Sequence, residues 1–339
     1  MYQALRVSLR SFASCLTTCI CISALLVSPA LAQVSGTGPS PASDFDVVLN
    51  LPGDETIFSV GVSTQINVFS GGAVPNGFFV PNSFSPTGAT NIVGEMNIFG
   101  GTVGDRLHSF GTELNIIGGT VGDDLSVEFG GVLNISGGTV GDFMFVDGCP
   151  SSPALVDISG GTIGNSFFVR ASGIVSISGG TIGNNFGVGS SSVLNISGGT
   201  IGHGFVAQSG SEVNISGSEF SVDGVVLDTL QFGQAVTITD RDVTLSGVLD
   251  DGEPFSFDLN SVSSFPNDFF EPGATLTVTL TAPFMLGDCD QNGVVDFADI
   301  PSFIGILQSG SFLGQADCNQ DTVVDFDDIE TFIAILTGS

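Results

Sequence analysis

Two acidic segments near the C-terminus carry the side chains best suited to chemistry. Each is twelve residues long, 288–299 and 317–328, with oxygen-bearing side chains at positions 1, 3, 5, 9 and 12. Calcium takes six to eight oxygen ligands, and a tight loop with this spacing supplies them, helped by a backbone carbonyl at position 7. The expected ligands are Asp288, Asp290, Asn292, Val294, Asp296 and Asp299, then Asp317, Asn319, Asp321, Val323, Asp325 and Asp328. We therefore expect two Ca²⁺ ions.

The segments that follow each loop have helical periodicity. Apolar residues recur at i, i+3, i+4, i+6 and i+7 over 300–307 and again over 329–336, which predicts two amphipathic helices, each with one buried face. Position 6 of a calcium loop favours glycine for its sharp turn, so Gly293 suits the first loop better than Thr322 suits the second. We expect the second site to be the weaker one.

This order of loop, helix, linker, loop and helix resembles the dockerin domain, specifically the duplicated calcium module of type I dockerins, over residues 284–339. Aspartate at position 12 also matches dockerins better than EF-hands, where glutamate is usual. The resemblance implies a cohesin-type scaffold protein as partner. Loop positions 10 and 11 depart from the usual hydroxyl or basic residues, because they hold Phe297 and Ala298 in one copy and Phe326 and Asp327 in the other.

The N-terminus and the charge set the compartment and the class of partner. Residues 1–32 predict a cleaved signal peptide, with Arg6 and Arg10 before a short apolar run and Ala30-Leu31-Ala32 as the cleavage site. No other stretch reaches membrane-spanning length, so we expect a secreted, extracellular or cell-surface protein without a membrane span. Formal charge is −30 for the whole chain and 3 − 35 = −32 without the leader. Such a surface excludes nucleic acid as a partner and favours divalent cations.

Three cysteines remain after the leader, Cys149, Cys289 and Cys318. Cys289 and Cys318 occupy the same position in the two calcium loops. A disulfide between them and a pair of free, inert thiols are both compatible with the sequence.

A second repeat fills residues 66–218. Its unit is typified by Leu114-Asn-Ile-Ile-Gly-Gly-Thr-Val-Gly122. Most copies begin about 19 residues after the one before, which predicts an all-β fold, a β-solenoid with one repeat per coil. Alternating apolar residues should point inward, and Gly-Gly should form a corner. An apolar residue further along each unit should build an internal ladder: Leu107, Leu125, Met144, Phe167, Phe186 and Phe205.

The flanking segments are expected to cap this solenoid. Residues 33–65 form the predicted N-terminal cap region, and 219–283 form a C-terminal cap of β-strands over Val236–Thr239, Val243–Leu249, Phe255–Leu259 and Thr275–Thr281, with a hairpin turn at 250–252. Such a cap would block edge-to-edge polymerisation. Residues 75–94 and 147–153 are insertions that should become loops on one flank.

One polar column of the solenoid has two interpretations. The residue after each Gly-Gly-Thr-Val/Ile-Gly is Asp105, Asp123, Asp142, Asn165, Asn184 and His203 in successive coils. These residues could form a calcium or sugar ladder, or supply Asp123 and Asp142 as an acid pair for glycoside hydrolysis. Alternatively they are turn residues that hydrogen-bond their own backbone, the interpretation that we favour. Arg106 and Arg170 are expected to be lone surface charges, and His108 and His203 isolated residues.

Two functions follow from these features. One is a secreted calcium-binding solenoid acting, without catalytic residues, as a structural, adhesive or carbohydrate-associated component of an extracellular assembly. The other is a polysaccharide lyase or glycoside hydrolase that a dockerin delivers to its substrate. An enzyme needs an acid pair, or an arginine beside a metal, on one flank of the solenoid, whereas a structural solenoid shows only serine, threonine and asparagine rows.

Overall fold

The computed structural model describes Pro39 and residues 47–51, 64–81, 94–227, 230–231, 233–263, 266–281, 285–290, 294–309, 314–319 and 323–338. The leader 1–32, most of 33–65 and the inserted residues 82–93 lie outside this part of the chain. Among the described residues, no helix is both long and apolar enough to cross a membrane.

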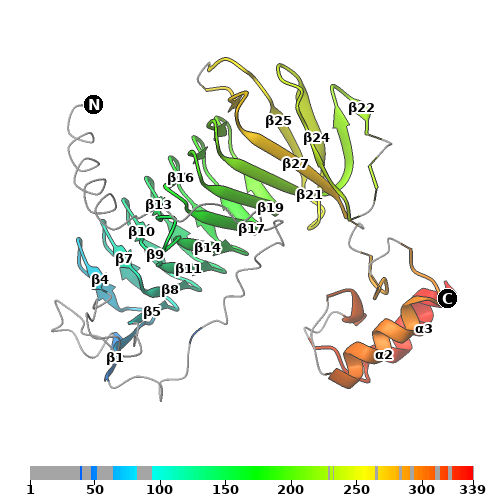
Figure 1. The fold of residues 1–339 in the computed structure, drawn as a ribbon. Helices are drawn as coiled ribbons and strands as arrows, with labels where there is room; N and C mark the ends of the chain where they lie inside the picture. Colours follow the sequence, from blue (N-terminus) through cyan, green and yellow to red (C-terminus); the bar gives the residue numbers. More distant parts are fainter. Residues whose placement is uncertain are drawn as a thin grey trace.

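The predicted fold class is confirmed: the chain forms a parallel β-solenoid of about seven turns, followed by two small C-terminal helices (Figure 1). The first strands of the coils are β2 (Thr64–Val68), β5 (Glu95–Ile98), β8 (Glu113–Ile116), β11 (Val132–Ile135), β14 (Leu155–Ile158), β17 (Ile174–Ile182), β19 (Val193–Ile201) and β21 (Glu212–Val222). The second are β3 (Ala73–Val74), β6 (Thr102–Val103), β9 (Thr120–Val121), β12 (Thr139–Val140) and β15 (Thr162–Ile163), and the ends of β17 and β19 continue their row.

The third strand of each coil belongs to a separate sheet that runs along the solenoid. These strands are β4 (Phe79–Pro81), β7 (His108–Phe110), β10 (Ser126–Glu128), β13 (Phe145–Asp147), β16 (Phe168–Arg170), β18 (Gly187–Val188) and β20 (Val206–Ala207). Each strand pairs in parallel with its equivalents in the coils above and below, so residues with the same place in the repeat stack directly on one another.

The internal ladder lies where the repeat predicts it. All six side chains, Leu107, Leu125, Met144, Phe167, Phe186 and Phe205, are fully buried. Phe186 stacks between Phe167 and Phe205, with ring centroids 4.8 Å and 5.4 Å away. Stacked rings at this spacing fill the interior without voids, which is the packing that a close-packed core requires.

Glycine is needed at the Gly-Gly corners for two reasons, a positive φ and the close approach of neighbouring coils. Gly138 has φ of +76°, and a Cβ built on it would lie 2.8 Å from the backbone carbon of Gly118 in the preceding coil. A larger residue would therefore be strained in its own backbone and would also push the two coils apart.

Asparagines of the first strands form a hydrogen-bonded ladder rather than a solvated outer row. Nδ2 donates to Oδ1 of the preceding coil from Asn67 to Asn50 (3.0 Å), Asn97 to Asn67 (3.0 Å), Asn115 to Asn97 (2.9 Å) and Asn134 to Asn115 (2.7 Å). Asn97 and Asn115 are buried, so their amides depend on these bonds. In the N-terminal coils this polar row is therefore buried and hydrogen-bonded rather than solvated.

Asp157 interrupts the ladder. It stacks on Asn134 in register, and the buried Oδ1 of Asn134 accepts no hydrogen bond within the described part of the chain. An ionised carboxylate has no proton to donate, whereas asparagine at 157 would have one. Burial also raises the pKa of Asp157, because a charge is costly there.

Asp157→Asn is therefore expected to stabilise the solenoid by about 1–2 kcal/mol at pH 7, as it supplies the missing donor. The gain should shrink as pH falls through the pKa of Asp157, because the protonated carboxyl can then donate as the amide does. The pKa of Asp157 is higher in the folded protein than in the unfolded chain. Its contribution to stability is therefore fully present at a pH below the unfolded pKa and is lost as pH rises through the folded pKa.

Urea unfolding of both proteins from pH 4 to pH 7 measures this difference. Asp124→Asn, which neutralises an exposed acid, is the matched control for the change in net charge. A gain no larger than that of Asp124→Asn, or one that is constant with pH, would contradict the role given to Asp157.

The two ends of the solenoid are extended by strands outside the repeat. At the N-terminal end, β1 (Val47–Leu51) pairs in parallel with β2. At the other end, β22 (Val225–Val226), β23 (Ala235–Thr237), β24 (Thr244–Leu249) and β25 (Pro254–Asp258) pair in antiparallel fashion. The predicted hairpin turn joins β24 to β25, with Gly252 at φ +89°.

The chain then returns to the solenoid. β26 (Phe269–Phe270) pairs in parallel with β20, and β27 (Thr275–Leu280) pairs in parallel with β21 over six residues (Figure 1). Thr277 stacks on Asn214, and its hydroxyl donates to that residue's Oδ1, which continues the ladder by one more step. The end of the predicted cap is thus itself a further coil.

Candidate metal centre

A small apolar core holds the two C-terminal segments together. Helices α2 (Asp299–Ser309) and α3 (Asp328–Thr337) cover both predicted helical segments, and a short 3-10 helix, η2 (Gly314–Ala316), precedes the second loop. Phe303 and Phe332, equivalent residues of the two copies, are buried with ring centroids 4.0 Å apart. The predicted helices are confirmed, but Ile304 and Ile333, expected on the buried faces, are exposed.

In the first loop, the aspartate at position 12 stabilises the tight turn of the backbone. Asp299 is completely buried and accepts the backbone N–H of Asp290 at Oδ1 (3.0 Å) and that of Asp296 at Oδ2 (2.9 Å). These donors are positions 3 and 9 of the loop. One carboxylate at the start of α2 therefore ties together the two halves of the loop.

The second loop repeats this arrangement. Asp328 is completely buried and accepts the backbone N–H of Asn319 at Oδ1 (3.0 Å) and that of Asp325 at Oδ2 (2.8 Å). Position 9 also behaves alike in both copies, because Asp296 accepts the N–H of Ala298 and Asp325 that of Asp327. Two segments that are separate in the sequence thus adopt one local structure through the same bonds.

The first loop gathers oxygens at the spacing a hard cation needs. Asp288, Asp290 and Asp299 each bring a carboxylate oxygen to within 4.8 Å of the others. Ligands on opposite sides of a calcium ion are about 4.6–5.2 Å apart, so three oxygens this close can share one ion. Asp288 is buried, and the sequence after Arg241 has no lysine, arginine or histidine that could balance the charge. These residues fit Ca²⁺.

The remaining predicted ligands are placed as follows. In the second loop Asp317 and Asp328 are buried, and Asn319 replaces the carboxylate of Asp290 with an amide. That loop therefore offers one charge fewer at position 3. Val294 and Val323, expected to contribute carbonyls, lie in the described loops with exposed side chains. Asn292 and Asp321 lie outside the described residues.

Cys289 and Cys318 are free thiols in the core below the loops. Burial, and next the neighbouring Cys318, raises the pKa of Cys289 to about 12, while burial raises that of Cys318 to about 11. Of the two states that the sequence left open, the structure has the protonated, unreactive pair.

We expect both thiols to resist iodoacetamide while calcium is present, because each side chain is nearly inaccessible. Chelation should raise their labelling rate at least about tenfold, since loss of the metal opens a core this small. Mass spectrometry of labelled peptides gives the rate at each cysteine, and Cys149, buried in the solenoid, serves as the internal control. Equal labelling rates with and without the chelator would show that the core does not depend on a metal.

The aspartate and asparagine column of the solenoid is hydrogen-bonded from coil to coil. Each Oδ1 accepts the backbone N–H of the column residue in the next coil, from Asp123 to Asp105 (3.1 Å), Asp142 to Asp123 (2.8 Å), Asn165 to Asp142 (2.7 Å), Asn184 to Asn165 (3.0 Å) and His203 to Asn184 (3.0 Å). The favoured interpretation is thus modified: the bonds join neighbouring coils rather than a residue to its own backbone. Where the structure describes side chains, this column contains no group of three histidine, cysteine, aspartate or glutamate side chains close enough to share one metal ion.

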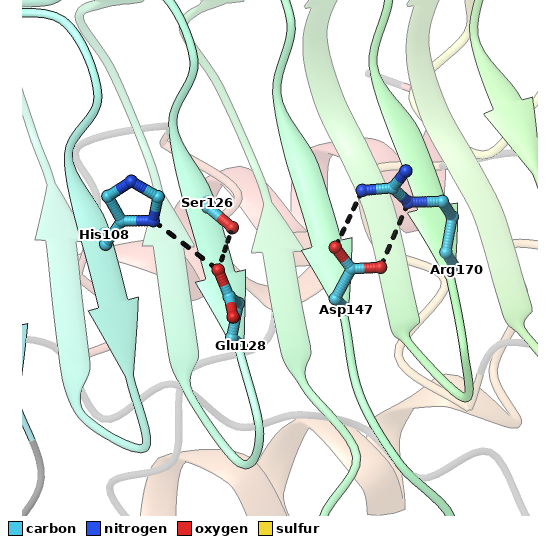
Figure 2. Close-up of polar contacts among 5 residues, drawn as sticks. All are labelled: His108, Ser126, Glu128, Asp147 and Arg170. Carbon is cyan, nitrogen blue, oxygen red and sulfur yellow. Dashed lines mark hydrogen bonds and ion pairs between the residues drawn. The ribbon is translucent and has the colours of Figure 1, made fainter. Parts of the chain in front are cut away.

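Arg170 and His108 are not the isolated residues that the sequence suggested. Arg170 forms a two-point ion pair with Asp147, Nε to Oδ1 at 3.0 Å and a terminal nitrogen to Oδ2 at 2.8 Å (Figure 2). His108 Nδ1 lies 3.5 Å from Glu128 Oε1, which also accepts the hydroxyl of Ser126 at 2.7 Å. Arg106 and His203 are exposed, as expected of surface residues.

These two pairs share one face of the third-strand sheet. Glu128, Asp147 and Arg170 occupy the same place in successive coils, and the bond from His108 lowers the pKa of Glu128. Burial raises the pKa of Asp147, an effect that Arg170 opposes. Sequence reasoning missed this face because it followed the Gly-Gly column. The signal was the alternation of the third strands, whose first and third residues point outward.

Comparison of the chain with protein-family models, with curated proteins and with solved structures found no match.

Proposed function

We propose that residues 284–339 form a two-calcium docking module that attaches a secreted β-solenoid to a partner protein. The observation that carries this proposal is the identical bonding of the two loops, in which a buried position-12 aspartate accepts the N–H groups of positions 3 and 9 in each copy. Such repetition is what two equivalent ion sites would require, and the resemblance to dockerins adds the class of function.

Exposed apolar residues, duplicated between the copies, support the docking role. Phe297 is 71% exposed and its equivalent Phe326 is 79% exposed, each at loop position 10. Ile304 and Ile333 lie seven residues further on and are also exposed, so each copy presents the same apolar pair near one helix face. Large exposed apolar residues mark interaction surfaces. The partner we propose is a cohesin-type scaffold protein with an apolar rather than an acidic contact surface.

For the solenoid we propose a structural, adhesive or carbohydrate-associated role in an extracellular assembly. The alternative function, a lyase or glycoside hydrolase, receives less support from the three residues that could be catalytic, Asp123, Asp142 and Arg170. Asp123 and Asp142 already use Oδ1 to join neighbouring coils, and Arg170 is committed to Asp147. No residue is assigned a catalytic role.

A pull-down from the secretome of the producing organism tests the docking function, with the full mature chain as bait in calcium and in chelator. We expect one partner to be retained only with calcium, and to be lost when Phe297 and Phe326 are both replaced by alanine. Phe143→Asn, which removes an exposed phenylalanine from the solenoid, should leave retention unchanged. Retention that is independent of calcium and of both phenylalanines would refute the proposal.

A further inference from the structure

The face that carries the Arg170–Asp147 ion pair and the His108–Glu128 contact has a second component, a set of aromatic rings. Outward positions of β10, β13 and β16 stack Ser126 on Phe145 and Phe145 on Phe168, while the parallel column stacks Glu128, Asp147 and Arg170. The residues between them, Val127, Val146 and Val169, are fully buried in the core. We call His108, Glu128, Phe145, Asp147, Phe168 and Arg170 the polar–aromatic strip.

The polar groups of the strip are fixed yet accessible. Arg170 is held by both oxygens of Asp147, and the exposed fractions of the two side chains are 44% and 21%. Those of His108 and Glu128 are 38% and 22%. These two contacts, each between adjacent coils, thus hold donors and acceptors in fixed positions, so part of the side-chain entropy is lost before a ligand binds (Figure 2).

The rings are fixed as well. Phe145 and Phe168 are near parallel, 18° apart with centroids separated by 5.9 Å, and the guanidinium carbon of Arg170 lies 4.5 Å from the centre of Phe145. Phe168 lies over Gly187 of the next coil, where a Cβ would be 2.8 Å from the ring. Glycine at 187 therefore allows Phe168 to lie against the sheet.

This composition favours a sugar polymer over the other large partners. Neither ring is strongly exposed, so the strip lacks the desolvated apolar centre that a protein partner needs. Polyanions are disfavoured, because the mature chain carries 35 carboxylates against three arginines. Hydroxyl groups suit what remains, since carboxylates accept from them and the guanidinium N–H groups not bonded to Asp147 donate to them, while the half-exposed Phe168 offers ring surface to the apolar face of a sugar.

We propose that the polar–aromatic strip binds a neutral polysaccharide that lies along the solenoid axis. Equivalent positions stack at the strand spacing of about 4.8 Å, so a linear polymer in this direction meets strip residues in four successive coils, from His108 to Arg170. The site lies on the solenoid and is independent of the calcium module, so it does not rest on the proposed docking function.

The test is binding of the mature chain to cellulose, chitin and xylan in chelator, with polygalacturonate as the charged comparison. We expect retention by at least one neutral polymer, none by polygalacturonate, and a loss of affinity of about tenfold or more in a Phe145→Ala/Phe168→Ala double variant. Arg170→Lys keeps the charge but loses the two-point pair, and should weaken binding about threefold or more.

Phe143→Asn removes an exposed phenylalanine outside the strip and should bind normally. Circular dichroism and thermal unfolding identify any variant that fails to fold. If the phenylalanine double variant does not fold, the binding of Arg170→Lys tests the proposal instead. Absence of binding to all three neutral polymers, or equal binding by folded strip variants and Phe143→Asn, would overturn the proposal.

Discussion

Replacing Asp299 and Asp328 with alanine is expected to abolish the binding of both calcium ions and to unfold residues 284–339 while the solenoid stays folded. Each substitution removes a ligand together with two charge-assisted bonds that close the loop. Bonds to charged groups contribute about 1.5–3 kcal/mol each. A domain of this size buries a small core, so we expect its folding to depend on the proposed calcium ions.

Native mass spectrometry of the full chain should show two bound ions before the change and none after it. Limited proteolysis should then cut within 284–339, whereas the strand signal in circular dichroism remains. The double variant Asp327→Ala/Glu330→Ala removes an equal charge from two exposed positions and should retain both ions. Two ions retained in the double variant would show that the carboxylates at position 12 are not ligands.

Phe186→Ala is expected to destabilise the solenoid by about 3–5 kcal/mol, because it leaves a cavity between two rings that cannot move together. Phe167 and Phe205 are each held in place by their own coils, and both are fully buried. In an array of repeats, stability is the sum of each repeat and its contacts with its neighbours. Loss of one ring therefore weakens both junctions of that coil.

Urea unfolding followed by circular dichroism measures the effect, and Phe186→Leu should cost clearly less because it leaves a smaller cavity. The exposed Phe143→Asn again serves as the comparison, with a change within about 0.5 kcal/mol. A loss of stability for Phe186→Ala as small as that of Phe143→Asn would mean that the ladder does not hold the coils together.

The paired C-terminal loops with their helices and the solenoid could be predicted from the sequence for the same reason: each is a local pattern repeated at a fixed interval. A twelve-residue loop brings its own ligands together, so Asp288, Asp290 and Asp299 could be grouped without knowing the fold. Phe186 could be assigned to the core because its equivalents keep one place in a unit of constant length. The exposure of Ile304 and Ile333 was not foreseeable, since helical periodicity shows which residues share a face but not how wide the buried part is.

Contacts between coils were the part that sequence alone could not resolve. The interval from Asp147 to Arg170 is longer than the regular repeat, because the insertion after Asp147 lengthens that coil, and their pairing appears only when the third strands are in register. The column at Asp123 was ambiguous for a similar reason. Whether its carboxylate faces a cation or the next coil's N–H depends on a side-chain direction that residue type does not determine.

The return of β27 to the solenoid has a consequence for the order in which the protein matures. Most coils pair with the chain immediately before them, so they can assemble one after another along the polypeptide, at a small cost in loop-closure entropy. The last coil is different, because Val213 pairs with Leu276, and the antiparallel strands β22 to β25 lie between these two residues in the sequence.

Until that partner arrives, the edge of β21 remains open to other chains. The solenoid is therefore completed only after residues 275–280 have been synthesised and have paired with β21. A chain cut short before residue 275 would keep its folded coils but be left with an adhesive end, prone to joining its own copies.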